Sequence, residues 1–367
     1  MCALPRQRIE PKMASVTQPL TRASVLDALP LIAPYIHTTP VLTSTTLSSL
    51  STPASGPRLT LFLKCENLQK IGAFKIRGAT HALARLSDDE LRRGVVTHSS
   101  GNHAQALSLA AAEAGRRRGI DVPAYVVMPA GSMPSKIAAT KGYGAAVTFS
   151  GPTAAEREEV VRGVQERTGA VLVPPYDHPD IIVGQGTVAL EFLEQVKGMV
   201  DGGLDVIVAP CGGGGLLAGI ATACEGTGVR VYGAEPREGA DDCVRGLKEG
   251  KRVEAVRSST VADGLRTPVG VNNWGVINNP EKVNGVYSVG EEEIMEAMRL
   301  VVERCKVLIE PSSAVPMAVV LGNPEWKAEI QRVFTGREEV RVGIVISGGN
   351  TTIEKIIEVF GKKEAEA

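Results

Sequence analysis

Short apolar runs rich in β-branched residues alternate along the chain with longer segments whose apolar residues repeat at helical spacing. The short runs predict strands at 61–65, 95–98, 124–128, 147–149, 171–173, 206–209, 231–234 and 342–346. The longer segments predict helices at 74–86, 102–118, 134–143, 154–167, 180–196, 291–305 and 351–360, with another helix after the glycines at 212–215. This alternation is typical of parallel sheets covered on both faces, so the sequence predicts an α/β fold.

Polar segments that contain glycine follow three of the predicted strands. They are 99–103 (Ser-Ser-Gly-Asn-His), 211–216 (Cys-Gly-Gly-Gly-Gly-Leu) and 347–350 (Ser-Gly-Gly-Asn). Ligands bind at the carboxyl ends of strands in open α/β sheets, which makes each segment a candidate site. Four successive glycines let the backbone turn tightly and direct several N–H groups at one phosphate. Helix capping and turn formation explain the other two segments equally well.

Lys75 and a group of carboxylates are the remaining candidates for chemistry. Lys75 begins a predicted helix, and the positive end of a helix favours the neutral amine that a Schiff-base lysine needs. Glu235, Asp241 and Asp242 lie in one loop with Ala240, and carboxylates with backbone carbonyls suit Mg²⁺ or Ca²⁺. A lone lysine and an acidic loop are more often simply solvated, so these residues alone leave both sites open.

The glycine segment has a second interpretation. Gly213, Gly215 and Ala218 fit the pattern G-x-G-x-x-A, and Glu235 follows Gly215 by 20 residues at the end of the next predicted strand. An acidic residue at that place binds the ribose in NAD enzymes. An NAD-dependent oxidoreductase is therefore an alternative for this segment.

Composition excludes several functional classes. The 367 residues include 40 Lys and Arg against 41 Asp and Glu, so no basic field attracts nucleic acid or anionic lipid. Aromatic residues are only 4%, which argues against a stacking surface for single-stranded nucleic acid. No apolar run approaches the roughly 20 residues that span a bilayer. Residues 1–24 lack the apolar core of a secretory signal and predict a disordered tail, with a mitochondrial presequence as the alternative.

The six cysteines are scattered along the chain, at positions 2, 65, 211, 224, 243 and 305. None forms a C-x-x-C pair, which argues against a zinc or redox motif. We therefore expect reduced thiols and a cytoplasmic location.

Taken together, the motifs resemble the fold type II pyridoxal-phosphate enzymes, and within them the serine racemase and serine/threonine dehydratase family. The resemblance runs from about Thr38 to Asn350 and rests on 67–79, 97–103, 184–187, 211–216 and 347–350, in the order that the family shows. It implies a fold like that of the tryptophan synthase β subunit, with two open, twisted, mostly parallel α/β domains. The large domain would comprise 25–92 and 175–367, the small domain 93–174, and the assembly would be a homodimer.

The resemblance also implies a role for each candidate residue. Lys75 would bond to pyridoxal 5'-phosphate and move protons on one face of the substrate, and Ser100 would act on the other face. The cofactor would be held by Phe74, Lys75, Asn102, Gly212, Gly213, Gly214, Gly215, Leu216 and Ser347. The substrate would be held by Ser99, Ser100, Asn102, His103 and Arg157. A divalent cation, Mg²⁺ or Ca²⁺, would be held by Glu235, Ala240 and Asp242.

The implied activity is racemisation of L-serine to D-serine, together with β-elimination of L-serine to pyruvate and ammonia. The alternative within the family is a dehydratase of L-serine and L-threonine, or of 3-hydroxyaspartate, with little racemisation. Tyr176 favours that alternative, because the racemases have asparagine there and the dehydratases an aromatic residue. Activation by ATP is a further implied property, although Ile71 replaces a threonine near the nucleotide site of the racemase.

Overall fold

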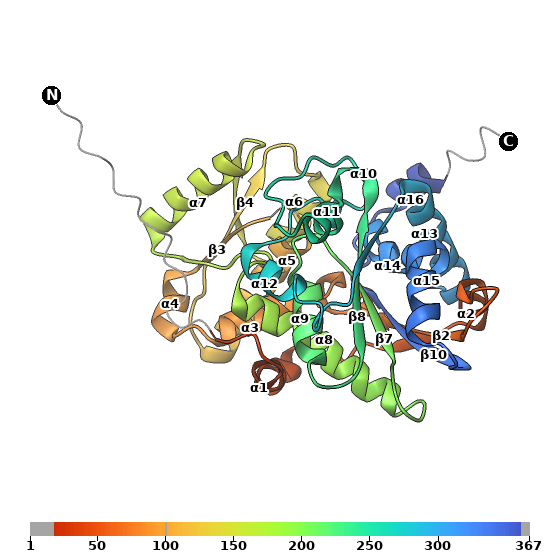
Figure 1. Cartoon of the computed structure of the whole chain (residues 1–367). Helices are drawn as coiled ribbons and strands as arrows, with labels where there is room; N and C mark the ends of the chain where they lie inside the picture. Colours follow the sequence, from red (N-terminus) through yellow and green to blue (C-terminus); the bar gives the residue numbers. More distant parts are fainter. Residues whose placement is uncertain (1–17, 100, 361–367) are drawn as a thin grey trace. The chain divides into compact units, whose positions relative to one another are not determined.

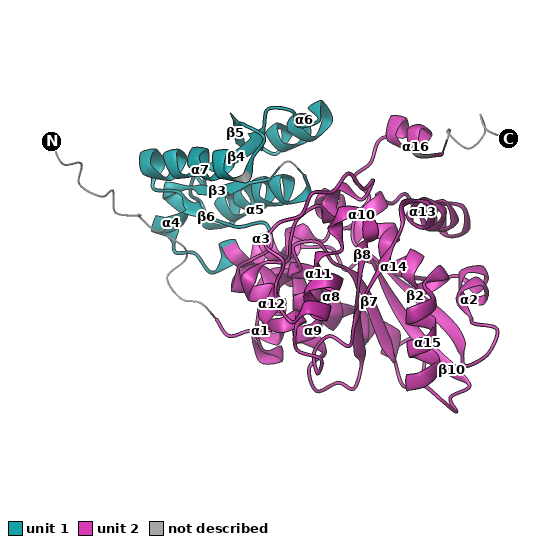
Figure 2. Cartoon of the chain, turned by 45° about the horizontal axis from the view of Figure 1, so that its top comes forward, with its two compact units in different colours: residues 1–17, 83–175 teal, residues 18–82, 176–367 magenta. Residues whose placement is uncertain are grey.

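The computed structural model describes residues 18–99 and 101–360 (Figure 1). They form two compact units, a smaller one of residues 83–99 and 101–175 and a larger one of residues 18–82 and 176–360 (Figure 2). The domain limits expected from the sequence stay a prediction. Most of the expected tail, at 1–17, lies outside the described residues. The tail prediction is wrong for residues 22–24, because the Thr21 side chain caps helix α1 (Arg22–Ile32) by accepting a hydrogen bond from the Ser24 N–H.

The larger unit contains a six-stranded sheet in the order β1-β2-β10-β7-β8-β9. Its strands are β1 (Val41–Thr43), β2 (Arg58–Cys65), β7 (Val206–Pro210), β8 (Arg230–Pro236), β9 (Val286–Val289) and β10 (Glu339–Ile346). Only β1 runs antiparallel to its neighbour. The central strands are apolar on both faces, which is characteristic of a parallel strand buried between helices. The predicted α/β fold with mostly parallel sheets is confirmed.

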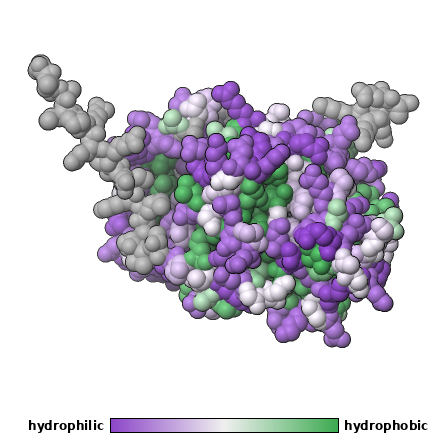
Figure 3. All heavy atoms as spheres, viewed as in Figure 1, coloured by the Kyte–Doolittle hydropathy of each residue, from purple (hydrophilic) through white to green (hydrophobic). Residues whose placement is uncertain are grey.

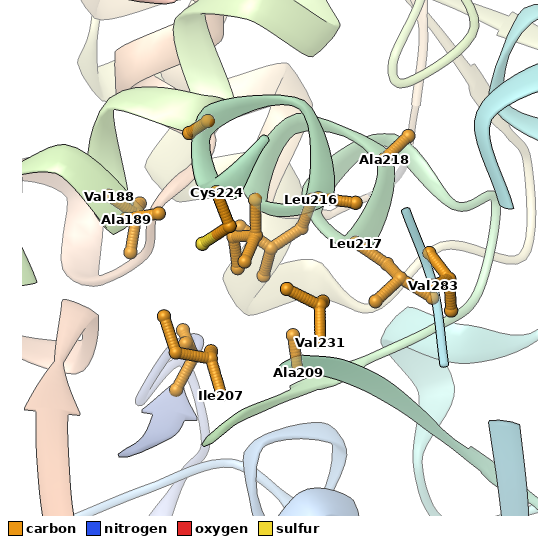
Figure 4. Close-up of a cluster of buried hydrophobic side chains, with 14 of the residues drawn as sticks. Val188, Ala189, Ile207, Ala209, Leu216, Leu217, Ala218, Cys224, Val231 and Val283 are labelled. Carbon is orange, nitrogen blue, oxygen red and sulfur yellow. The ribbon is translucent and has the colours of Figure 1, made fainter. Parts of the chain in front are cut away.

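Helices cover both faces of this sheet. Side chains alternate across a strand, so Ile207 and Ala209 of β7 join one core and Val206 and Val208 the other. The first core includes α1, α8 (Pro179–Lys197), α9 (Gly215–Cys224) and α12 (Val271–Ile277). The second includes α2 (Thr45–Ser51), α13 (Glu291–Cys305), α14 (Pro311–Gly322) and α15 (Pro324–Val333). Figure 4 shows Leu216 and Leu217 of α9 in the first core with Ile207 and Val231.

Four further helices lie wholly or mainly in the larger unit. They are α3 (Lys75–Ala84), α10 (Arg237–Ala240), α11 (Asp242–Glu249) and α16 (Ile353–Phe360). Helix α10 is interrupted by non-helical backbone at Glu238 and Gly239. A side chain at Gly239 would collide with the Arg257 carbonyl, so this turn requires glycine.

The smaller unit has a parallel four-stranded sheet in the order β5-β4-β3-β6. Its strands are β3 (Val95–His98), β4 (Ala124–Pro129), β5 (Ala146–Ser150) and β6 (Val171–Leu172). Its helices are α4 (Asp88–Arg93), α5 (Asn102–Arg118), α6 (Pro134–Gly142) and α7 (Ala154–Thr168). Helix α7 packs Val161 and Val164 against Val96 and Val127. Its charged residues face away from this core, which explains the amphipathic pattern of its sequence.

Hydrophilic residues cover much of the face seen in Figure 3, with apolar patches between them. Within residues 18–99 and 101–360, no helix combines the length and the apolar character needed to cross a membrane.

Candidate active site

In the larger unit, the candidate residues lie at the carboxyl ends of four neighbouring parallel strands. The segment after β2 leads to Lys75, and Ser347 directly follows β10. The glycines 212–215 follow β7, and Glu235 is the next-to-last residue of β8. Since these strands are adjacent in the order β2-β10-β7-β8, the residues share one edge of the sheet. Ligands bind at this edge in open α/β folds.

Backbone hydrogen bonds tie the segment before Lys75 to the segment that begins at Ser347. The Phe74 N–H donates to the Ser347 carbonyl at 3.0 Å, and the Gly349 N–H donates to the Gly72 carbonyl at 2.9 Å. Ser347 is only 3% exposed, and its hydroxyl lies 3.0 Å from that of Ser313. The Ser313 hydroxyl also donates to the Gly348 carbonyl at 2.7 Å. The backbone that leads into Lys75 and the serine pair therefore belong to one hydrogen-bonded structure.

Lys75 is the first residue of α3, and its amine is easier to deprotonate than an ordinary lysine. Burial lowers its pKa to about 8, against the opposing effect of the Glu310 carboxylate. The expected direction is confirmed, but the main cause is loss of water rather than the helix end. The Lys75 Nζ also lies 5.1 Å from the centre of the Phe74 ring. A neutral amine is therefore accessible near neutral pH.

A buried network of charges lies next to the start of α3. The Arg77 guanidinium donates to both oxygens of Glu66 at 2.7 Å and to Glu191 at 3.1 Å. Lys64 pairs with Glu191 and donates to the Thr39 carbonyl at 2.7 Å. Arg77, Glu66 and Lys64 have no exposed side-chain surface. The fork of arginine N–H groups leaves little freedom to the backbone two residues after Lys75.

The glycine segment has a backbone that other residues could not adopt. Gly214 has a φ of +89°, and a side chain at Gly213 would overlap the ring of Tyr176. The Asn273 side-chain amide fixes the loop by donating to the Gly213 carbonyl at 2.6 Å. Helix α9 begins at Gly215, followed by the buried Leu216. N–H groups in a first helical turn have no partner within the helix and attract anions, so this loop fits a phosphate group.

Glu235 and Asp242 are buried carboxylates near the start of α11. Glu235 accepts hydrogen bonds from the N–H groups of Val244 at 2.7 Å and Cys243 at 3.2 Å. Asp242 accepts one from the Val269 N–H at 2.9 Å. Burial raises the pKa of Glu235 well above its usual range and that of Asp242 to about 6. A bound cation would favour the charged forms of both groups.

Ala240, the third expected metal ligand, is a buried residue at the end of α10. It offers only its backbone carbonyl, a ligand type that Mg²⁺ and Ca²⁺ accept. Asp241, in contrast, pairs with Arg245 at 2.9 Å on the partly exposed side of the loop. The donor set of oxygens therefore fits a hard divalent cation.

The remaining candidates belong to the smaller unit. The Ser99 N–H donates to the Val127 carbonyl at 3.1 Å, and the Gly101 N–H donates to the Ser99 hydroxyl at 3.3 Å. Asn102 begins α5. The Nε2 atom of the buried His103 makes a hydrogen bond of 3.1 Å with the Val173 carbonyl of the same unit. Ser100 lies outside the described residues.

Arg157 lies in the first turns of α7, and its guanidinium donates to the Pro152 carbonyl at 2.9 Å. Burial lowers the pKa of His98, at the end of β3, and the charge of Arg157 adds to this effect. A positive charge therefore acts near the carboxyl end of β3, the strand that leads to Ser99.

Comparison with known proteins identifies the class. A family model described as "Pyridoxal-phosphate dependent enzyme" matches residues 32–347, and the chain belongs to this family. The serine racemase of Arabidopsis thaliana is 42% identical over 339 residues, which cover 92% of this chain and 95% of the relative. The beta-hydroxyaspartate dehydratase of Paracoccus denitrificans is 41% identical over 340 residues, with coverage of 92% and 98%. The solved structure of maize serine racemase is 38% identical, with a TM-score of 0.82 and coverage of 94% and 98%.

These matches confirm the predicted resemblance to the serine racemase and dehydratase family, and with it pyridoxal phosphate as cofactor. The family model spans both sheets of the molecule, whereas the NAD pattern accounts for the glycine loop and Glu235 alone. The NAD-dependent alternative therefore has no support beyond its own short segment.

Glu310 and Ser313 are parts of the site that sequence reasoning missed. The negative charge of the Glu310 carboxylate raises the pKa of Lys75, against the effect of burial. The same carboxylate accepts a hydrogen bond from the Asn350 N–H at 3.2 Å. Both residues lie at the start of α14, which follows a helix rather than a strand. The only available signal was the run Glu-Pro-Ser-Ser at 310–313, a polar group before an apolar helix.

Proposed function

We propose that this enzyme racemises L-serine to D-serine and also eliminates its β-hydroxyl to give pyruvate and ammonia. Pyridoxal phosphate, when bound, withdraws electrons from the substrate's α-carbon and makes its proton acidic. The observation that carries the proposal is the lowered pKa of Lys75, about 8, on the same sheet edge as Ser347 and the glycine loop. Its neutral amine is the base that accepts the α-proton.

The neighbouring residues hold the cofactor and set its electronic properties. The N–H groups at 212–216 would hold the phosphate, and Phe74 and Asn102 would hold the ring. Ser347, whose hydroxyl lies 3.0 Å from that of Ser313, would offer a neutral hydroxyl to the pyridine nitrogen. A hydroxyl stabilises positive charge on this nitrogen less than a carboxylate does, so loss of the β-hydroxyl competes with return of the proton.

Racemisation needs a second proton donor, on the opposite face of the substrate. We assign that role to Ser100, and substrate binding to Ser99, Ser100, Asn102, His103 and Arg157. The relatives named serine racemase support this choice. Glu235, Ala240 and Asp242 hold Mg²⁺ or Ca²⁺, which stabilises the loop beside β8 rather than taking part in the chemistry. A homodimer in the cytoplasm completes the proposal.

A second candidate, a 3-hydroxyaspartate dehydratase, is favoured by one contact. Tyr176 packs its ring against Gly213, within the loop that binds the cofactor phosphate. A relative of this chain is a beta-hydroxyaspartate dehydratase at 41% identity. In this alternative Ser100 binds the substrate carboxylate only, and little D-amino acid forms.

The test is to incubate the purified holoenzyme with L-serine and Mg²⁺ and to separate the enantiomers by chiral chromatography. D-serine should appear together with pyruvate, and Ser100→Ala should abolish the D-serine while it keeps part of the elimination. Lys75→Ala should lose both activities and the borohydride-reducible cofactor bond. If only keto acid and ammonia form, with 3-hydroxyaspartate preferred over L-serine, the second candidate replaces the first.

A further inference from the structure

Two cysteines and one carboxylate meet inside the larger unit, although the sequence contains no recognisable metal-binding spacing. The ligand atoms of Cys211, Glu235 and Cys243 all lie within 4.8 Å of one another. All three residues are buried, with exposed fractions of 0%, 1% and 0%. They come from the end of β7, from β8 and from α11, so only the folded chain brings them together.

The spacing of these atoms is close to what a tetrahedral ion requires. Zinc binds sulfur at about 2.3 Å and carboxylate oxygen at about 2.0–2.2 Å, so its ligands lie roughly 3.5 Å apart. The distances between the observed ligand atoms therefore need to shorten by no more than about 1.3 Å. Two sulfur atoms and one oxygen leave a fourth position for water.

The chemistry of the three ligands differs from that of the oxygen site proposed above. Thiolates prefer soft and borderline ions, whereas Mg²⁺ and Ca²⁺ prefer oxygen ligands. Cys211 and Cys243 cannot serve a hard cation well, and Asp242 and Ala240 are not needed by a thiophilic one. Glu235 is common to both sets, so the two kinds of ion compete for it.

We infer that Cys211, Glu235 and Cys243 form a binding site for a thiophilic divalent cation, with Zn²⁺ as its representative. Each thiol releases its proton to solvent as the metal–sulfur bond forms. Cys211 directly precedes Gly212, and Cys243 lies in the first turn of α11. A bound ion therefore fastens the phosphate-binding loop to α11, and it displaces Mg²⁺ from Glu235.

The site is tested on tag-free holoenzyme that has been treated with a mild chelator, loaded with zinc sulfate and dialysed. Elemental analysis should find about one tightly held zinc per chain, and X-ray absorption should find two sulfur neighbours at about 2.3 Å. Replacement of zinc by Co²⁺ should produce tetrahedral bands in the visible region, at longer wavelengths than the cofactor absorbs. Added Mg²⁺ should weaken zinc binding, because Glu235 is shared.

Variants separate this site from the oxygen site. Cys211→Ala and Cys243→Ala each remove a metal ligand and should weaken zinc binding by more than about 100-fold. Even the loss of a residue that only hydrogen-bonds to a ligand weakens metal binding by about 10–100-fold. Cys224→Ala is the matched control, since Cys224 is a buried cysteine at the far end of α9, and it should bind zinc normally. Asp242→Asn should weaken Mg²⁺ binding and leave zinc binding intact.

Three outcomes overturn the inference. They are an absence of tight zinc in the wild type, zinc neighbours that are only oxygen or nitrogen, and zinc that depends on Asp242 but not on the cysteines. Cofactor absorbance checks that each variant is folded. If the cysteine variants fail to fold, the sulfur neighbours in wild-type protein decide the question alone. Because zinc binding is measured directly, its failure leaves the proposed racemase activity untouched.

Discussion

Helix α9 of the larger unit and helix α7 of the smaller unit both follow a parallel strand, but they differ greatly in their exposure to solvent. Every residue of α9 is buried. In α7, Val161 and Val164 are the buried residues among those whose side chains are described, and the others, most of them charged, are exposed or half-buried. Helix α9 lies between its sheet, α8 and α12, whereas α7 contacts its sheet on one side only. The glycine loop 212–215, for which we propose phosphate binding, therefore leads into a helix that is enclosed by protein.

The same contrast extends to the polar groups. In the larger unit Arg77, Glu66 and Lys64 form ion pairs without exposed surface. In the smaller unit, ion pairs such as Arg162 with Glu159 are exposed. Buried pairs fix geometry and are costly to break, whereas exposed pairs contribute little. The larger unit is thus built to hold the groups around Lys75 in one arrangement.

The largest expected effect comes from breaking the buried network. Arg77→Met leaves Glu66 and part of Glu191 without their cation, so the free energy of unfolding should fall by about 3–5 kcal/mol. Chemical denaturation of the apoenzyme measures the loss. A decrease below about 1 kcal/mol would mean that the network behaves like a surface pair.

The close packing of Gly213 against Tyr176 should give the next largest effect. Gly213→Ala places a methyl group into the tyrosine ring and should lower the free energy of unfolding by about 1–3 kcal/mol. Tyr176→Ala alone opens the space, so the double variant should be less destabilised than the sum of the two single variants. Strict additivity would show that the ring does not oppose the added methyl group.

The pH dependence of cofactor uptake tests the effect of burial on one side chain of the larger unit, Lys75. In the proposed mechanism, uptake of pyridoxal phosphate by the apoenzyme requires the neutral Lys75 amine. Its rate should rise with pH with a midpoint at about 8 and level off above that, because burial lowers the lysine pKa to about 8. Glu310→Gln removes the carboxylate that favours the charged amine, so it should move the midpoint to lower pH. Stopped-flow absorbance measures both profiles, and a midpoint near 10.5 in the wild type would contradict the structure.

The smallest expected effect is at the surface of α7. Arg162→Ala removes an exposed pair with Glu159 and should change the free energy of unfolding by less than about 0.5 kcal/mol. The same denaturation experiment as for Arg77→Met checks it. A loss comparable to that of Arg77→Met would remove the distinction between the two units.

The sequence predicted the helices and strands whose own residues show a clear pattern of apolar and polar positions. Helices α5 and α13, each with one polar side, were predicted with the bounds that the structure shows. Helix α14 was missed, because it is buried from Pro311 to Val320 and carries Pro316, so it has neither a polar face nor a clean helical composition. The short edge strands β1 and β9 were also missed, since few residues define them.

For the site, the strand ends could be predicted because each motif is contiguous. Lys75, the glycine loop and Ser347 each follow a predicted strand directly or through one short segment. Contacts between distant segments could not be predicted in the same way. Glu310 reaches the site from the start of α14, and Cys211 meets Cys243 only after β8 and α11 have packed.

The position of β10 in the sheet has a consequence for biosynthesis. This strand is the last of its sheet to be made, yet it lies between β2 and β7, which are made before it. At roughly 5–20 residues per second, β2 waits tens of seconds on the ribosome for its permanent neighbour. Such long sequence separation slows folding and leaves an apolar strand edge available to wrong partners. Nascent chains that stop before β10 should therefore depend on chaperones and be unable to take up the cofactor.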